Sequence, residues 1–340
     1  IYFYSESFFP GIPKNYLYLG MLQAVSLAIQ GLIFPIMLGL GKAFEYSLIL
    51  VYSSLLSLIA LTTGWLTVGL SVSLALILQI SSSVLISIYI YITVFKTIDE
   101  VGNYSSKYLK DALNFGSGVF ISVISTFANE KMILIVLNFF GGVVYVSLYT
   151  LAQALTERIY LLADAIGTIL MPKIAEDSSN NSKVLTPLLF KMTFIITLFL
   201  SVILILLAEK IITLVYTSEF YESAKIMQAL LVAVIFSSGW RVLSQDLNGR
   251  GYTKETASIN ISITCISIIL AIVLLPKIGL IGAAIASIFS YIFGLIIGTF
   301  LFISKTKNVS IKNMISFSKN EILMLKNAFK YITLFYKQKK

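Results

Sequence analysis

The sequence predicts an all-α, polytopic bundle of membrane-spanning helices with the two-lobed plan of a transporter. Of the 340 residues, 58% are hydrophobic and only 12% are charged, and the mean hydropathy is +0.92. A typical globular domain carries about 25% charged residues, so this chain cannot cover a water-facing surface. The composition therefore excludes a soluble enzyme, a secreted disulfide scaffold and a disordered chain.

Nine apolar segments are long enough to cross a membrane, because a helix needs about 20 apolar residues to do so. The stretch 46–95 holds no charged residue, and the region from Gly64 to Gly69 is the expected turn within it. The segments are too long, and alternate too little, for the strands of an outer-membrane barrel. The predicted spans are 16–40, 46–64, 69–95, 112–137, 143–170, 188–208, 224–245, 257–275 and 279–303.

Lysine and arginine placement predicts the orientation, because cytoplasmic loops of membrane proteins carry the excess of positive charge. One set of connections holds nine of these residues and the alternate set holds four. We expect the richer set, and the C-terminus with it, to face the cytoplasm. The richer set is Lys42, Lys96, Lys107, Lys110, Lys173, Lys183, Lys191, Arg250 and Lys254, and the poorer set is Lys14, Lys210, Lys225 and Lys277.

The tail after residue 303 holds nine lysines and an apolar stripe at helical spacing. The stripe is Ile322, Leu325, Phe329, Ile332 and Tyr336. This pattern is typical of an amphipathic helix that lies on anionic lipid. A flexible basic tail is the alternative.

A shift of 210 residues superposes one part of the sequence on another. The matched pairs are Gly39 with Gly249, Gly41 with Gly251, Glu45 with Glu255 and Gly69 with Gly279. Each copy has a span, a Gly-x-Gly turn, a second span, a glycine turn and a third span. Both Gly-x-Gly turns fall on the predicted cytoplasmic side, so the copies run parallel. Internal repeats of this kind are typical of transporters.

The repeat predicts a division of the chain into two lobes. We expect 1–95 to form the end of an N-terminal lobe, 96–111 a cytoplasmic linker, and 112–303 a C-terminal lobe of six spans. The remaining residues, 304–340, form the basic cytoplasmic tail. Counterparts of the three spans at 112–208 would precede residue 1, so the first lobe is expected to lack its first spans.

Three short motifs stand at the ends of predicted spans. They are Met-Pro-Lys-Ile at 171–174, Asn-Gly-Arg-Gly at 248–251, and Pro276, Gly279, Gly282, Ala283 and Ala284 between the last two spans. With these motifs the chain resembles, over about 15–303, the polysaccharide-exporter (O-antigen flippase) branch of the multidrug/oligosaccharidyl-lipid/polysaccharide transporter superfamily. It departs from that pattern at Asn129, Glu130 and Lys131, where the branch often carries more arginine.

The resemblance implies a two-lobed, MATE-like fold and a multi-pass protein of the bacterial inner (cell) membrane. It also implies a flippase that moves an undecaprenyl-diphosphate-linked oligosaccharide by alternating access, for the biosynthesis of O-antigen, capsule or exopolysaccharide. The implied partners are the lipid-linked oligosaccharide and the polysaccharide polymerase machinery. The basic tail adds anionic membrane lipid as a further expected partner.

Ionisable residues at membrane depth are costly and usually face a cavity. An arginine at the centre of a span costs about 2.5–3.5 kcal/mol and needs an anion, which a lipid diphosphate supplies. We therefore expect Arg241, Arg158 and Lys131 to bind the diphosphate. Glu157 and Asp164 are either groups that couple transport to protons or sodium, or counter-ions of Arg241.

Polar residues at helical spacing predict a wet cavity between the spans. The other residues expected to line it are Glu130, Gln153, Gln245 and Ser238. In the first span, Gln23, Ser26 and Gln30 repeat the pattern. Hydrogen bonding between helices is the alternative for the amides and serines.

The sequence carries no recognisable catalytic motif. Histidine is absent, Cys265 is the only cysteine, and no phosphate-binding Gly-x-x-x-x-Gly-Lys loop is found. We expect no enzymatic activity, metal, cofactor or nucleic-acid partner, and we attribute the net charge of +9 to loops at a membrane surface. Two alternatives stay open: a multidrug exporter of the same superfamily, and a membrane polysaccharide polymerase. The short outward connection at 209–223 argues against the polymerase.

Overall fold

The computed structural model describes residues 14–69, 71–96, 105–176, 180–216, 218–306 and 309–317, and every regular element in these ranges is a helix. The chain divides into two compact units, 1–104 and 105–340. Each unit is described by itself. The predicted amphipathic helix over 322–336 lies outside the described residues, as does half of the predicted linker, 97–104.

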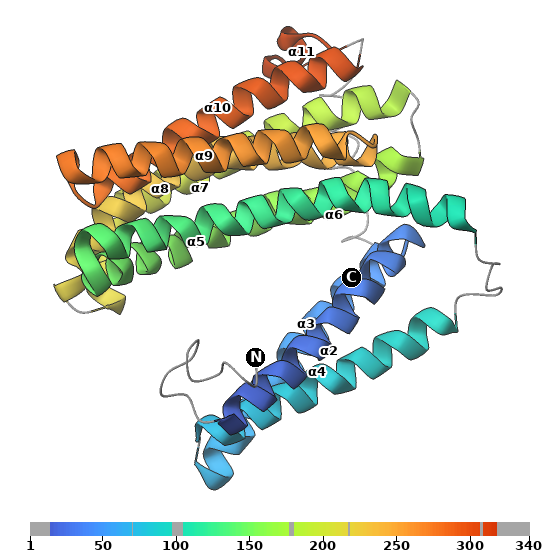
Figure 1. The fold of residues 1–340 in the computed structure, drawn as a ribbon, viewed down its shortest axis with the longest axis vertical. Coiled ribbons are helices and arrows are strands. Elements are labelled where there is room, and N and C mark those ends of the chain that lie inside the picture. The colour runs from blue at the N-terminus through green and yellow to red at the C-terminus, as the bar shows by residue number, and fades with distance from the viewer. Residues whose placement is uncertain are drawn as a thin grey trace, which may run out of the picture. The chain divides into compact units, whose positions relative to one another are not determined.

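Unit 1 contains three long helices, α2 (Lys14–Gly39), α3 (Ala43–Val68) and α4 (Val72–Phe95) (Figure 1). Helix α4 packs against both α2 and α3. A polar network joins α2 to α4: the Gln30 amide donates to the hydroxyls of Ser83 and Ser87 at 3.1 Å, and the hydroxyl of Ser26 lies 2.8 Å from that of Ser83. Gln30 and Ser26 therefore serve hydrogen bonding between helices, which was the alternative to a cavity.

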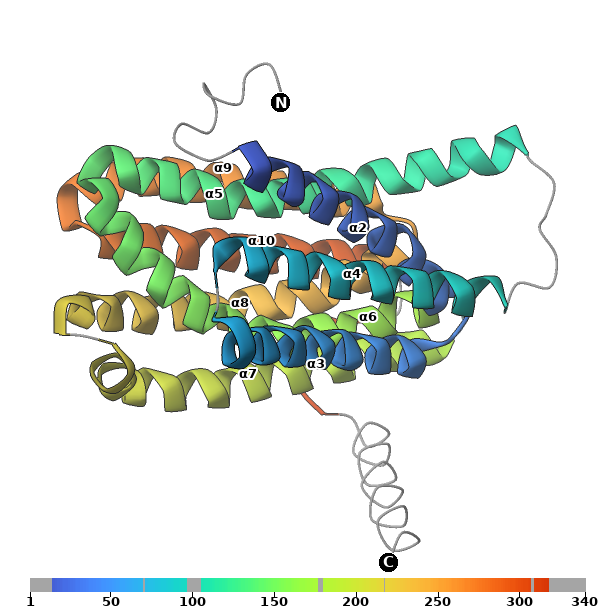
Figure 2. The same cartoon turned by 90° about the horizontal axis from the view of Figure 1, so that it is seen from below.

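Unit 2 contains the remaining helices. They are α5 (Ser106–Thr156), η2 (Glu157–Ile159), α6 (Tyr160–Glu176), α7 (Asn180–Val215), η3 (Ser218–Phe220), α8 (Tyr221–Gly249), α9 (Thr253–Ile278), α10 (Ile281–Thr306) and α11 (Ile311–Ile315). Gly142 breaks α5 with φ 61° and ψ −158°, a conformation that glycine adopts readily. Figure 2 shows the chain doubling back there, so α5 supplies one span and the start of the next.

Within the described residues, eight helical stretches are apolar and long enough to cross a membrane, and the stretch Ser106–Ala175 has 70 residues. Because that stretch reverses at Gly142, it contains both predicted spans at 112–137 and 143–170. The predicted all-α membrane bundle is confirmed. Several helices run past the predicted ends, as at Asn180, because a helix continues into the headgroup layer where polar side chains are solvated.

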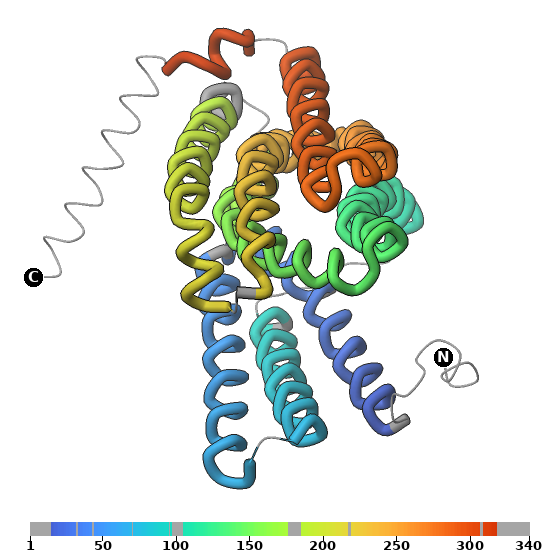
Figure 3. Tube along the Cα trace, turned by 90° about the vertical axis from the view of Figure 1, so that its left-hand side faces the viewer, coloured from blue at the N-terminus to red at the C-terminus, as the bar shows by residue number. Residues whose placement is uncertain are grey.

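Helix α8 is the central helix of unit 2. In the apolar stretch of α8, 72% of the residues are buried inside the bundle, whereas the value for the other spans of the unit is 22–33%. It packs against α5, α6, α7 and α10, and Figure 3 shows these helices gathered around it in a view along the unit. A polar side chain on α8 is therefore held inside the bundle and not against lipid.

The 210-residue repeat is visible in the backbone. Helices α3 and α9 have 26 residues each, and both are entered through a turn with a glycine at positive φ, 73° at Gly41 and 87° at Gly251. The amide of Gly41 donates to the carbonyl of Leu38 at 3.0 Å, and that of Gly251 donates to Asn248 at 2.9 Å. Gly69 and Gly279 end the two helices, again at positive φ. The two units thus share one three-helix plan.

Candidate functional site

Unit 2 contains an open cavity of about 750 Å³, lined by residues of α5, η2, α6, α8, α9 and α10. Its ionisable lining residues, other than tyrosine, are Glu130, Glu157, Arg158, Asp164 and Arg241. All five are predicted site residues, and they come from three different spans. The formal charge of this set is three negative against two positive.

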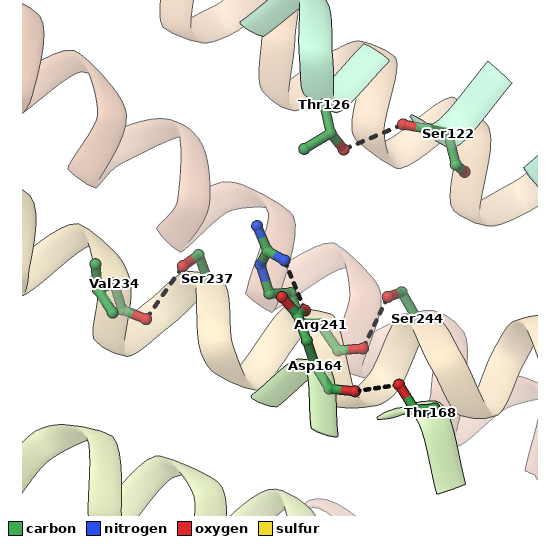
Figure 4. A network of polar contacts seen from close by, with 8 residues as sticks. All are labelled: Ser122, Thr126, Asp164, Thr168, Val234, Ser237, Arg241 and Ser244. Carbon is green, nitrogen blue, oxygen red and sulfur yellow. Dashed lines mark hydrogen bonds and ion pairs between the residues drawn. The ribbon is translucent and has the colours of Figure 1, made fainter. Parts of the chain in front are cut away.

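Arg241 on α8 and Asp164 on α6 both line the cavity and form an ion pair in its wall. Nη1 of Arg241 lies 2.7 Å from Oδ1 of Asp164, and the guanidinium carbon lies 4.2 Å from the ring centroid of Tyr160. Figure 4 shows the two charged groups directed at each other. Asp164 is therefore a counter-ion of Arg241, one of the two roles that the sequence left open.

Arg158 lies on the 3₁₀ turn η2, where the helical path between α5 and α6 tightens. Its side chain is exposed and lines the cavity. Among the described residues it makes no ion pair and no side-chain hydrogen bond. A 3₁₀ segment inside a longer helix often marks a functional hinge or local strain, and here it presents an unpaired guanidinium to the cavity.

A second, smaller space of about 40 Å³ adjoins the cavity and shares Glu130 and Glu157 with it. The Gln153 amide donates to Oε1 of Glu157 at 2.6 Å. The buried amide oxygens of Asn129 and Gln153 line the same space and have no hydrogen-bond partner. Two residues with carboxylates and two with unpartnered amide oxygens thus line one small space, two from each of the two spans that α5 enters.

Two predicted residues lie away from the cavity. Lys131 is exposed, and its Nζ lies 5.6 Å from the ring centroid of Phe127. Ser238 is fully buried with an unpartnered hydroxyl, and its neighbour Ser237 lines the cavity in its place. Gln245 lines the cavity as expected. One residue is about 100° of helix rotation, which is enough to move a side chain off the lining face.

Trp240, Asn260 and Tyr291 are among the lining residues that sequence reasoning missed. The Trp240 indole donates to Oδ1 of Asn260 at 2.8 Å, and the Asn129 amide lies 3.4 Å from the hydroxyl of Tyr291. The available signal was a polar group inside an otherwise apolar span, namely Asn260 in α9 and Tyr291 in α10.

These features define a class: a multi-pass helical membrane protein with internal repeats and a charged polar cavity, which is the plan of a secondary transporter. The family model "Lipid II flippase MurJ" matches residues 46–339, and the chain belongs to this family. It is a family of transporters and not of enzymes. The predicted membership of the multidrug/oligosaccharidyl-lipid/polysaccharide transporter superfamily is thereby confirmed.

Known structures share the fold. An outward-facing multidrug resistance MATE family transporter has a TM-score of 0.76 at 20% identity, covering 90% of this chain and 74% of its own. The lipid II flippase MurJ in an inward closed conformation has a TM-score of 0.59 at 21% identity, covering 92% and 66%. A transporter of the superfamily from Pyrococcus furiosus has a TM-score of 0.69 at 20% identity, covering 78% and 63%.

An uncharacterized membrane protein of Methanocaldococcus jannaschii is 25% identical over 217 residues, which is 61% of this chain. The chain spans 43% of the length of that archaeal relative.

Proposed function

We propose that this protein is a flippase that moves a polyprenyl-diphosphate-linked saccharide across the cytoplasmic membrane of a bacterium by alternating access. Family membership supports a lipid-linked sugar as substrate. The observation that carries the proposal is Arg158, a guanidinium that faces the cavity without a protein anion. Lipid II and the undecaprenyl-diphosphate-linked oligosaccharide of surface polysaccharides share the diphosphate that this group would bind.

The two arginines have different roles in this proposal. An unpaired arginine at membrane depth is costly, and a diphosphate offers it several charge-assisted hydrogen bonds in the forked geometry that guanidinium groups favour. Arg158 is free to make them at once. Arg241 is already held by Asp164 at 2.7 Å, so it reaches the substrate only when that pair opens. Lys131 lies outside the cavity and has no part in binding.

The carboxylates supply the coupling. Glu130 and Glu157 face the same small space, and two negative charges held close together favour uptake of a positive charge. We propose that a proton or a sodium ion binds there in one half of the transport cycle. In this proposal Asp164 serves as the partner of Arg241 and does not bind the coupling ion.

Reconstitution into liposomes tests the proposal with two labelled substrates, lipid II and an undecaprenyl-diphosphate-linked oligosaccharide. We expect translocation of at least one of them, measured as label that becomes accessible to a membrane-impermeant quencher. Arg158→Ala should reduce the rate at least tenfold, and Arg158→Lys should retain part of it. Lys131→Ala is the matched control, since it removes a nearby cation outside the cavity. Equal rates for Arg158→Ala and the unmodified protein would contradict the proposal.

A cation exporter is the second candidate, and the excess of carboxylates over arginines in the cavity is the observation that favours it. The fold shared with MATE transporters is compatible with it. Ethidium efflux from the same liposomes separates the two candidates. Efflux without translocation of either lipid would establish the exporter.

A further inference from the structure

Lys191 on α7 has an unusual environment for a lysine within an apolar helix. Its side chain is only 4% exposed, and its Nζ donates to the backbone carbonyls of Asn313 at 3.0 Å and Ser316 at 2.9 Å. The same ammonium lies 4.8 Å from the ring centroid of Phe317. The carbonyls at a helix C-terminus lack helical partners and attract a cation. Lys191 thus fastens the end of α11 to α7.

The segment 309–317 is also fixed from its other side. Val309 and Met314 are 5% and 3% exposed and belong to a core cluster that includes Trp240 and Phe302. The hydroxyl of Ser310 accepts from the amide of Asn313 and caps α11. Figure 3 shows α11 leaving the end of α10 and crossing toward α7. The segment is therefore an ordered part of unit 2, attached at both ends.

Its outward face is apolar and basic. Ile311 and Ile315, four residues apart, are 52% and 75% exposed, and Phe317 is 39% exposed. Lys312 follows Ile311, lies beside the two isoleucines on the helix surface, is exposed, and makes no ion pair within the described part of the chain. Lys305 nearby is engaged, because its Nζ lies 3.4 Å from Glu255.

The depth of Lys191 places this face at the membrane boundary. The apolar stretch of α7, Leu185–Val215, has 31 residues, whereas about 20 suffice to cross the hydrocarbon core. Its first residues therefore extend into the headgroup layer, and Lys191 is the seventh of them. A short helix beside Lys191, with exposed apolar side chains and a lysine beside them, matches the pattern of an interfacial anchor.

We propose that Val309–Phe317 is an interfacial anchor that binds anionic phospholipid, and that Lys191 is the positioning residue that holds it in place. Charge argues for lipid over a protein partner, since the sequence after 303 carries nine lysines and a single acidic residue, Glu321. Ile311 and Ile315 enter the acyl boundary, and Lys312 lies beside the lipid phosphate. This site is distinct from the substrate cavity and does not depend on which substrate is moved.

The test compares quenching of a fluorophore by nitroxide-labelled phosphatidylglycerol and phosphatidylcholine in nanodiscs that contain both lipids. The fluorophore is attached at Ile315→Cys or Leu214→Cys in the full chain with Cys265→Ser. Leu214 is 88% exposed at the opposite end of α7. A fluorophore there reports the ratio of quenching by the two lipids that is expected without specific lipid binding. We expect the ratio of phosphatidylglycerol to phosphatidylcholine quenching to be about fivefold higher at 315, which corresponds to about 1 kcal/mol for one lysine near anionic lipid.

Two pairs of variants separate lipid binding from folding. Lys312→Gln should lower the ratio at 315 toward that at 214, and Lys312→Arg should retain it. Lys191→Met should lower the ratio and speed hydrogen exchange of the amides at 309–317, while Lys191→Arg should preserve both. Equal ratios at 315 and 214, or no quenching at 315 by either lipid, would overturn the proposal. So would a ratio that is unchanged in Lys312→Gln.

Discussion

The guanidinium of Arg241 and the carboxylate of Asp164 lie 2.7 Å apart in the wall of the unit 2 cavity and join the central helix α8 to α6. Their side chains are 26% and 46% exposed, so water reaches both. The energy of such a pair lies between that of a surface pair, at most about 1 kcal/mol, and the roughly 3 kcal/mol lost when one partner of a buried pair is removed. An anion that enters the cavity competes with Asp164 for this arginine.

A double-mutant cycle on this pair should show coupling. Arg241→Gln leaves Asp164 without a cation and should lower translocation at least tenfold, with a loss of stability of about 1–3 kcal/mol. Adding Asp164→Asn should restore most of the stability, because the uncompensated charge is gone, but not the transport. The measurements are thermal unfolding in detergent and flipping in liposomes. Additive losses of stability in the double variant would show that the pair is not coupled.

The orientation can be tested on the two ends of one helix. Lys254 and Lys277 are both exposed and stand near the N- and C-terminal ends of α9. The charge bias predicts that Lys254 faces the cytoplasm and Lys277 faces outward. In a Cys265→Ser background of intact cells, Lys277→Cys should react with a membrane-impermeant maleimide, and Lys254→Cys should react only after lysis. The reverse pattern would invert the predicted topology.

Hydropathy predicted the spans because the lipid core imposes one length on every crossing. The repeat could be found from glycines matched at one offset, and the structure gives the reason for two of these pairs, since Gly41, Gly69, Gly251 and Gly279 have positive φ, which restricts the residue type. The faces of single helices could also be predicted, since Glu157, Asp164 and Arg241 follow from helical periodicity. The contacts between helices could not be predicted from the sequence. Nothing in the sequence states that Asp164, and not Glu157, pairs with Arg241.

Other differences arise from local geometry. The charge bias groups Lys191 with the cytoplasmic connections, and the structure shows it buried on α7, where its Nζ donates to the carbonyls of Asn313 and Ser316. Lys131 follows Glu130 in the sequence, yet a rotation of about 100° per residue turns it away from the cavity. A pattern on one helix cannot reveal partners that a distant segment provides.

The repeated turns offer a matched stability test. Gly39 and Gly41 both have open space around the Cβ position, but only Gly41 has positive φ, 73°. Gly41→Ala should destabilise the protein by about 1–2 kcal/mol, because an L-residue is strained there. Gly39→Ala should be neutral or stabilising, since alanine favours a helix by up to about 1 kcal/mol over glycine.

Gly251 has the same open space and a φ of 87°, so Gly251→Ala should cost as much as Gly41→Ala. Thermal unfolding in detergent measures all three variants. Tolerance of alanine at Gly251 together with a loss at Gly41 would show that the two copies of the turn are not energetically equivalent.

The carboxylates of the smaller space carry the last prediction. Glu130 and Glu157 line it together with Asn129 and Gln153, whose buried amide oxygens have no hydrogen-bond partner. Replacing both acids, Glu130→Gln with Glu157→Gln, keeps the shape and removes the two negative charges. Translocation driven by an ion gradient should then fall at least tenfold, whereas exchange of labelled for unlabelled substrate without a gradient should continue, because Arg158 and Arg241 are intact.

The control for that prediction is Glu219→Gln, which removes an exposed acid outside the cavity. Liposomes with a sodium or a proton gradient identify the ion, since only the coupled gradient should accelerate the unmodified protein. Loss of both gradient-driven transport and exchange in the double variant would instead make these carboxylates part of the substrate site. Full gradient-driven transport would show that the coupling ion does not bind between Glu130 and Glu157, and would leave the diphosphate site at Arg158 unaffected.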